Sequence, residues 1–261
     1  SQMHGIILVD AHNKPVSNYI SWQDQRATQK EKSSKDRRFI DTLEDNLKEF
    51  RCKTGTPIRP GMMGSLLYWL KKNRAIPRGH IKASFLGDYI TSYLTGSGIL
   101  CNPTHAAGSG VFDIREGKWL EKFKTLLGVS EKLLPSIVPS GTCIGEISAR
   151  ISHHFRFKHK TPVLSSIGDY QAALYGCKLK LGAPSLHLGT GSISSIITKE
   201  MEMSDMHETR PYLDGLYTRC VSGLPGGRTM NVFKEFVIDF SNETRGAQNK
   251  VKAEKVMAIL D

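Results

Sequence analysis

Residues 165–176 read SSIGDYQAALYG and place a carboxylate, Asp169, between a glycine and an aromatic residue. The apolar run PVLSSI (162–167) precedes this acid, and a run of small and apolar residues follows it. The pattern predicts a strand that meets Gly168 and a helix that begins near Asp169. One interpretation of Asp169 is a helix N-cap, which satisfies free backbone N–H groups. The other is a base at the carboxyl end of a strand, where α/β sheets place their ligands.

Downstream, residues 183–199 (APSLHLGTGSISSIITK) read as two β-rich runs around a short turn, which predicts a tight hairpin. The turn contains Gly189, Thr190, Gly191 and Ser192. Consecutive small residues leave backbone N–H groups uncovered, so such a turn can hold a phosphate; the alternative is an ordinary turn. Because neither a lysine nor a helix follows, it is not a Walker A loop. A further strand ends in the glycine-rich GLPGG (223–227), and residues 230–240 predict a helix.

Upstream, the chain opens with two β-rich segments, GIILVD (5–10) and VSNYISW (16–22), which predict two strands joined by a turn. The polar stretch 23–37 is expected to be loop or exposed helix. Apolar residues then recur at helical spacing. This spacing predicts helices over residues 39–50, 62–73, 82–96 and 118–128, and again over 170–182. Strands that alternate with helices in this order predict an α/β fold.

The composition is that of a globular protein. Of 261 residues, 39% are hydrophobic and 23% are charged, and no run of 18 apolar residues predicts a membrane span. The first residues, SQMHG, do not resemble a signal peptide. Five scattered cysteines without a CxxC motif indicate reduced thiols and a cytoplasmic protein. The net charge of +11 favours anionic ligands, but the basic runs lack interleaved aromatic residues, so we favour a solvated surface over nucleic-acid binding.

Polar residues flank the two predicted strands at the start of the chain. Gln2, Met3 and His4 come before them, and Trp22 and Asp24 come after them. These groups could hydrogen-bond sugar hydroxyls, and the indole could pack on a sugar face. The alternative is a structural tryptophan and a surface pair between Asp24 and Arg26. The histidines of the basic segment lack a carboxylate or cysteine partner, so we expect surface positions and no metal site for His153, His154 and His159.

Together these motifs resemble the FGGY family of carbohydrate kinases. The series runs in order from QMHG (2–5) through WQDQR (22–26), LGDYITSYLTG (86–96), LLPSIVPSGTCIGEI (133–147), GDYQAALYG (168–176), LGTGS (188–192) and GLPGG (223–227). The resemblance implies an actin-like, ribonuclease-H-like fold of two α/β domains around a cleft. Residues 1–181 would form the sugar-binding N-terminal domain without its first strands, and residues 182–261 would begin the nucleotide-binding domain.

The resemblance also implies roles for individual residues. Asp169 matches the catalytic base, which accepts the proton of the attacking sugar hydroxyl. The sugar pocket would include Gln2, Met3, His4, Trp22, Asp24 and Asp169. The ATP phosphates would lie on Gly189, Thr190, Gly191, Ser192, Gly226 and Gly227. The expected cofactors are ATP and Mg²⁺, and the expected partners are a small sugar and ATP, without nucleic acid or membrane.

Within the family the chain is most similar to the sedoheptulokinase branch. The implied reaction is phosphorylation of the terminal hydroxyl of sedoheptulose to sedoheptulose 7-phosphate, in the pentose phosphate pathway. A xylulokinase or another pentulokinase is the alternative on the same scaffold.

Three departures qualify the resemblance. The sequence contains no Asp-x-Gly-Thr segment, which in the family helps to hold Mg²⁺ and phosphate, and the family's adenosine-binding region lies beyond GLPGG. We therefore expect a chain truncated at both ends, which binds sugar weakly and turns over little ATP. His105 stands where many members carry an asparagine. An alternative of another class is a non-catalytic protein that binds sugars or polyanions.

Overall fold

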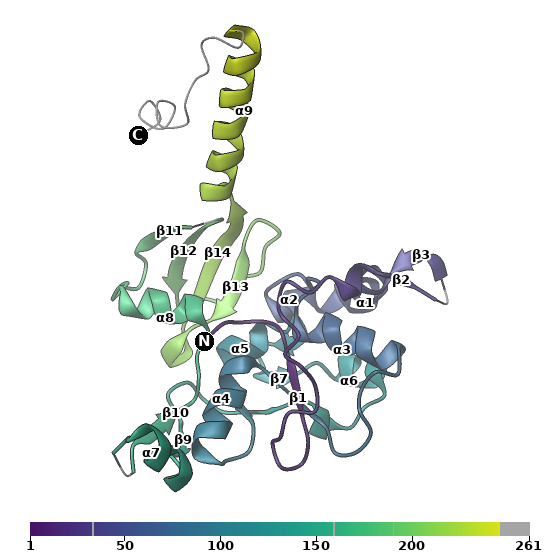
Figure 1. The fold of residues 1–261 in the computed structure, drawn as a ribbon, viewed down its shortest axis with the longest axis vertical. Coiled ribbons are helices and arrows are strands. Elements are labelled where there is room, and N and C mark those ends of the chain that lie inside the picture. The colour runs from purple at the N-terminus through teal and green to yellow at the C-terminus, as the bar shows by residue number, and fades with distance from the viewer. Residues whose placement is uncertain (33, 159, 190, 246–261) are drawn as a thin grey trace.

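The computed structural model describes residues 1–245 with the exception of residues 33, 159 and 190 (Figure 1). The chain forms a helix-rich body, from which a four-stranded sheet and a long helix extend (Figure 1). Within the described residues, no helix is both long and apolar enough to cross a membrane.

The first strand pairs differently from the prediction. Strand β1 (Ile7–Val9) pairs along its length with β4 (Lys82–Ser84), and the second predicted strand is reduced to isolated bridges at Pro15 and Ile20. Asn13 turns the chain with a φ of 58°, and after it only separate bonds reach the first strand, such as those from the N–H groups of Val16 and Ile20 to Leu8 and Ile6. The pairing with β4 also shortens the predicted 82–96 helix, which begins at Leu86.

The helices of the body follow the apolar spacing. They are α1 (Phe39–Leu47), α3 (Met63–Lys72), α4 (Leu86–Thr95) and α6 (Glu121–Leu127). Gly96 ends α4 in the left-handed conformation that the sequence predicts for its cap. Helices α1, α3 and α6 bury their apolar residues, as the periodicity predicts, whereas α4 buries Asp88 and Thr91 and leaves Ile90 and Tyr93 exposed.

Shorter elements complete the body. The single-turn helices are α2 (Arg51–Thr54) and α5 (Pro103–Ala107), with 3-10 turns at Arg26–Thr28, Lys48–Phe50, Glu131–Leu133 and Leu213–Gly215. Three short strand pairs are antiparallel: β2 (Lys30–Glu31) with β3 (Ser34–Arg38), β6 (Phe112–Asp113) with β7 (Lys118–Trp119), and β9 (Cys143–Glu146) with β10 (Pro162–Leu164). A fourth pair, β5 (Leu100–Cys101) with β8 (Ser136–Ile137), is parallel. Helix α7 (Ala149–Phe155) precedes β10. The polar stretch 23–37 is thus partly a hairpin.

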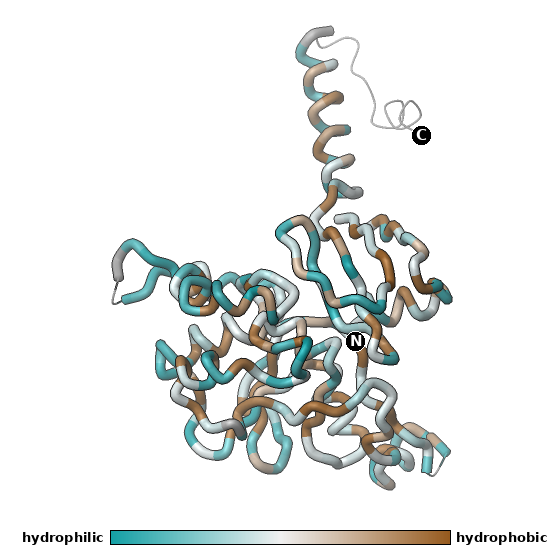
Figure 2. Tube along the Cα trace, turned by 180° about the vertical axis from the view of Figure 1, so that it is seen from behind, coloured by the Kyte–Doolittle hydropathy of each residue, from teal (hydrophilic) through white to brown (hydrophobic). Residues whose placement is uncertain are grey.

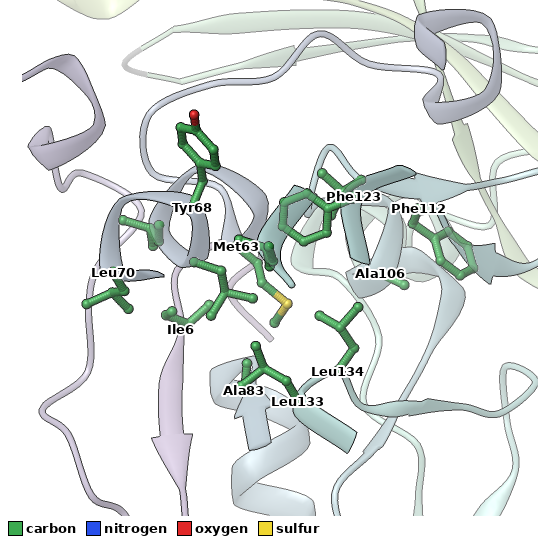
Figure 3. Packing of buried hydrophobic residues seen from close by; sticks show 14 of the residues in the cluster. Ile6, Met63, Tyr68, Leu70, Ala83, Ala106, Phe112, Phe123, Leu133 and Leu134 are labelled. Atoms are coloured by element: carbon green, nitrogen blue, oxygen red, sulfur yellow. The ribbon is translucent and has the colours of Figure 1, made fainter. Parts of the chain in front are cut away.

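The main hydrophobic core lies between β1, β4 and the helices of the body. Ile6, Met63, Phe85, Phe112 and Phe123 are all 0–1% exposed and belong to one cluster (Figure 3). The side chains come from segments more than 100 residues apart in sequence, so burial of this cluster fixes the arrangement of the body.

Helix α8 (Asp169–Gly176) links the body to an antiparallel sheet of order β11-β12-β14-β13. The strands are β11 (Pro184–Leu188), β12 (Ser192–Thr198), β13 (Glu208–Pro211) and β14 (Tyr217–Leu224). The predicted hairpin between β11 and β12 is present, with Leu188 opposite Ser192. Helix α8 ends at Gly176, earlier than the predicted residue 182, and a second core cluster that includes Met3, Tyr170 and Ile197 joins it to the sheet.

Helix α9 (Gly227–Arg245) extends away from the sheet (Figure 1). It contains the predicted helix 230–240 and is longer at both ends. Hydrophobic residues recur along it (Figure 2), and the side chains of Phe236 and Phe240 stack with ring centroids 6.1 Å apart. The architecture is mixed α/β, as the sequence predicts, but most of its described strands pair antiparallel.

Candidate functional site

The carboxylate of Asp169 lies where α8 begins. Gly168 occupies the N-cap and Asp169 is the first helical residue, so the N-cap interpretation is wrong by one position. The carboxylate still accepts a hydrogen bond from the N–H of Tyr170, at 2.9 Å. The backbone N–H of Asp169 donates to the carbonyl of Ser1 at 2.8 Å. This contact places the first residues of the chain beside Asp169, which is exposed to solvent.

His4 is held in one orientation by its backbone and its ring. Its φ is 65°, and its Nδ1 lies 2.6 Å from the carbonyl oxygen of Gly108. Because a carbonyl only accepts, Nδ1 carries the proton and Nε2 of the neutral ring keeps a free lone pair. The pKa of His4 is lowered to about 4, chiefly by burial; the hydrogen bond to Gly108 opposes this, Arg210 and Arg59 add to it, and Asp169 opposes it. Two arginines and Asp169 therefore lie within electrostatic reach of the ring.

This lowered pKa makes stability depend on pH with a definite sign. Between the ordinary pKa of 6.5 and about 4, the unfolded chain binds a proton at His4 that the folded chain does not. The contribution is fully present above pH 6.5 and is lost as the pH falls. We expect the wild type to lose about 1–2 kcal/mol more than His4→Asn between pH 7.5 and 5.0 in urea unfolding. Equal losses in the two proteins would contradict the assigned neutral ring.

The two arginines meet at one buried carboxylate. Nε and Nη2 of Arg210 lie 3.1 and 2.7 Å from Oε2 of Glu208, and Arg59 donates to Oε1. Hydroxyl groups of Thr56 and Ser222 donate to the same carboxylate at 3.0 and 2.7 Å. Burial would raise the pKa of Glu208, but the arginines outweigh it and hold the pKa far below its usual range. This cluster joins the segment before α3 to β13 and β14.

The other predicted sugar-binding residues divide into two groups. Met3 is 5% exposed and packs in the second core cluster, while Gln2 is half-buried. Trp22 is 49% exposed, and its backbone lies against Gly61. The carboxylate of Asp24 is occupied by Arg26, with contacts of 2.8 and 2.9 Å. The structure therefore places His4 and Asp169 together and leaves Asp24 in the local ion pair that the alternative interpretation describes.

The two glycine-rich segments predicted to hold phosphate lie against each other. The N–H of Gly227 donates to the carbonyl of Gly189 at 2.8 Å, and the N–H of Gly189 donates to the carbonyl of Gly191 at 3.2 Å. Thr190 lies outside the described residues. Ser192 is 2% exposed, and within the described part of the chain its hydroxyl has no hydrogen-bond partner. An unpaired buried hydroxyl beside a glycine turn suits an anionic ligand.

The contact between these segments depends on Gly226. A Cβ atom there would lie 2.7 Å from the carbonyl oxygen of Gly189 and 2.8 Å from the carbonyl carbon of Gly191, so backbone would have to move. We expect Gly226→Ala to lower the free energy of unfolding by about 1–3 kcal/mol. Gly176→Ala is the matched control, because that position has open space around it. The prediction fails if the two variants unfold at the same urea concentration.

Sequence reasoning missed the Glu208 cluster and a second buried network. Nδ1 of His105 lies 3.0 Å from Oδ1 of Asp88, and the hydroxyl of Ser166 donates to the same oxygen at 2.6 Å. Both His105 and Asp88 are fully buried. The signal for the Glu208 cluster is the alternation in HETRP (207–211), which puts Glu208 and Arg210 on one side of a strand. No group of three or more histidine, cysteine, aspartate or glutamate residues among the described positions could hold a metal ion.

Comparisons with known proteins agree on one family. Residues 1–176 match the model of "FGGY family of carbohydrate kinases, N-terminal domain". A glycerol kinase of Halothermothrix orenii is 30% identical over 224 residues, which are 82% of this chain and 41% of that protein. A xylulose kinase of Lactococcus lactis is 26% identical over 242 residues, which are 90% of this chain and 46% of that protein. The chain thus spans less than half the length of these relatives.

Solved structures show the same fold. Ligand-bound xylulose kinase from Lactobacillus acidophilus superposes with a TM-score of 0.78 at 21% identity, covering 92% of this chain and 48% of that one. Plasmodium falciparum glycerol kinase with ADP superposes with a TM-score of 0.72 at 21% identity. The superposition covers 91% of this chain and 48% of that one. The fold is therefore that of about half of an actin-like ATPase.

Proposed function

The chain belongs to the FGGY family of carbohydrate kinases, and from this membership we propose that it supplies the sugar-binding side of an ATP-dependent phosphotransferase acting on a ketose. The observation that carries the proposal is the geometry at the start of α8. An exposed carboxylate, Asp169, begins a helix whose first N–H is bonded to Ser1, and His4 presents a free acceptor beside it.

The proposed mechanism assigns positioning to these residues. Nε2 of His4 accepts a hydrogen bond from one sugar hydroxyl, and Asp169 accepts the proton of the hydroxyl that is phosphorylated. Phosphoryl transfer requires little covalent chemistry from the protein, so correct orientation of the attacking oxygen accounts for much of the rate enhancement. The Glu208 cluster keeps positive charge close to His4 and Asp169, which disfavours protonation of the ring and keeps its acceptor free.

The nucleotide side of the proposal rests on the glycine-rich turns. ATP with Mg²⁺ would supply the transferred phosphoryl group. The N–H groups of Gly189 and Gly227 already donate within the protein, so the buried hydroxyl of Ser192 is the described group that suits a phosphate. Mg²⁺ usually keeps several waters and binds substrate phosphates, so in this proposal the ATP phosphates would hold it and Asp169 stays free as the base. The same proposal includes a domain division at residue 181. It also includes a cytoplasmic location, with which the five free cysteines agree.

Sedoheptulose is the proposed substrate, supported by the similarity of residues 168–228 to the sedoheptulokinase branch. The relatives compared above are glycerol and xylulose kinases, so these substrates belong in the test. Calorimetry and ADP release should be measured with sedoheptulose, xylulose, ribulose and glycerol in parallel, with MgATP in the second assay. We expect weak binding that is strongest for sedoheptulose, and little ADP release because the sequence lacks Asp-x-Gly-Thr. If another sugar binds more tightly, that sugar becomes the proposed substrate. If none of the four binds, the proposed sugar site is refuted.

A further inference from the structure

A second cavity lies away from the proposed sugar site. It has a volume of about 1040 Å³ and is formed by the turn after β1, the loop after α3 and the loop after α6. Ligand pockets for small molecules usually measure about 300–1,000 Å³, so this cavity is large enough for a metabolite. Its floor is apolar, with buried Ile81, Leu133 and Leu134.

The rim of this cavity is strongly basic. Among the described side chains that line the cavity, Asp10 is the one acidic group and six are basic: Lys71, Arg74, Arg78, His80, Lys82 and Lys132. The carboxylate of Asp10 already accepts hydrogen bonds from the backbone N–H groups of His12 and Lys14, at 2.8 and 2.9 Å. Within the described part of the chain, Arg74, Arg78, Lys82 and Lys132 form no ion pair. The cavity therefore concentrates positive charge that the protein itself does not neutralise.

The position of the cavity separates it from His4 and Asp169. Strand β1 runs from Ile7 to Val9, so His4 precedes one end of the strand and Asp10 follows the other. Lys82, opposite Val9 in the ladder, marks the same far end. None of the described residues that line the cavity belongs to the proposed sugar site. A ligand in the cavity therefore does not occupy the proposed sugar site.

We propose that this cavity binds a small anion that carries two or more phosphate groups. Several unpaired cations around one concave site suit clustered negative charge, and two of them are arginines, which recognise phosphate through paired N–H donors. None of the described lining residues is a phenylalanine, tyrosine or tryptophan, so the site lacks the stacking surface of single-strand nucleic-acid binders. A concave site of this volume suits a compact ligand. The inference rests on the cavity alone and is independent of the proposed kinase reaction.

The test compares two double variants of equal net charge. Arg78→Gln with Lys132→Gln removes two cations from the cavity, whereas Lys158→Gln with Lys180→Gln removes two exposed lysines elsewhere. Inorganic tripolyphosphate, without Mg²⁺ or sugar, is titrated into each protein by calorimetry. We expect saturable binding to the wild type, at least tenfold weaker binding to the cavity variant, and binding within twofold of wild type for the control.

Each outcome of the titration decides the proposal. Absent binding to the wild type, or an equal loss in both double variants, would overturn it. A single-stranded DNA 20-mer is the comparison ligand, and tighter cavity-dependent binding of DNA than of tripolyphosphate would show that the ligand class is wrong. The four side chains are exposed, so thermal unfolding should match the wild type. If the cavity double variant does not fold, Arg78→Gln and Lys132→Gln are titrated singly, with the same criteria.

Discussion

Replacing Glu208 with glutamine is expected to lower the free energy of unfolding by about 3–5 kcal/mol. The substitution keeps the size of the side chain and removes its charge. Arg210, whose side chain is 11% exposed, then remains buried without a counter-charge, and Arg59 loses its partner. Removing one member of a buried ion cluster destabilises the fold by more than the intact cluster stabilises it, because the remaining charge stays desolvated. Urea unfolding followed by tryptophan fluorescence measures the loss.

Glu200→Gln is the matched control for this change. Glu200 also pairs with an arginine, Arg219, at 3.2 Å, but its side chain is 81% exposed. Exposed ion pairs contribute about 0–1 kcal/mol, so this variant should unfold close to the wild type. Because the pKa of Glu208 is held low in the folded chain, its contribution is present above the unfolded pKa of 4.5 and is lost as the pH falls below it. Similar losses in the two variants would show that the Glu208 cluster does not stabilise the fold.

The second large effect concerns Asp169. We expect Asp169→Asn to reduce the small ketose-dependent ADP release of this chain to the sugar-free background, because a general base contributes about 10²–10⁴-fold, while sugar affinity changes by less than about tenfold. The amide oxygen of asparagine still accepts from the N–H of Tyr170, so the start of α8 is retained. The amide cannot accept a proton at neutral pH, so the proposed base is removed without loss of the local structure.

The control for Asp169→Asn is Asp239→Asn. Asp239 is an exposed acid on α9, so the change in net charge is the same and the site is untouched. Turnover should fall only in the first variant. ADP release at the wild-type rate in both would exclude Asp169 as the base, and a joint loss of sugar binding and unfolding temperature would make its role structural.

The sequence predicts those parts of the fold that depend on local pattern. Helices α1 and α3 follow from apolar spacing, and the β11–β12 hairpin follows from its glycine turn. Strand β4 was missed because three residues, Lys82–Ser84, carry no pattern of their own and are extended by pairing with β1. Tertiary contacts override weak local preference there.

The site divides in the same way. Asp169 is predictable because the residues around it form a strand, a glycine and a helix in sequence. The ion pair between Arg59 and Glu208 is not predictable, because the two residues are 149 positions apart and no sequence pattern around one indicates the other. The neutral state of His4 depends on the carbonyl of Gly108, a contact made across 104 residues. Electrostatics of this kind depend on the folded arrangement rather than on a motif.

The pairing of the first residue with the start of α8 also has a consequence for the order of folding. The nitrogen of Ser1 donates to the carbonyl of Ile167, 166 residues along the chain, and the carbonyl of Ser1 accepts from the N–H of Asp169. During synthesis at about 5–20 residues per second, Ile167 follows Ser1 by roughly 10–30 s. The core helices can pack during that interval, whereas the segment with His4 must wait. We therefore expect the proposed catalytic centre to be among the last parts of a nascent chain to become structured.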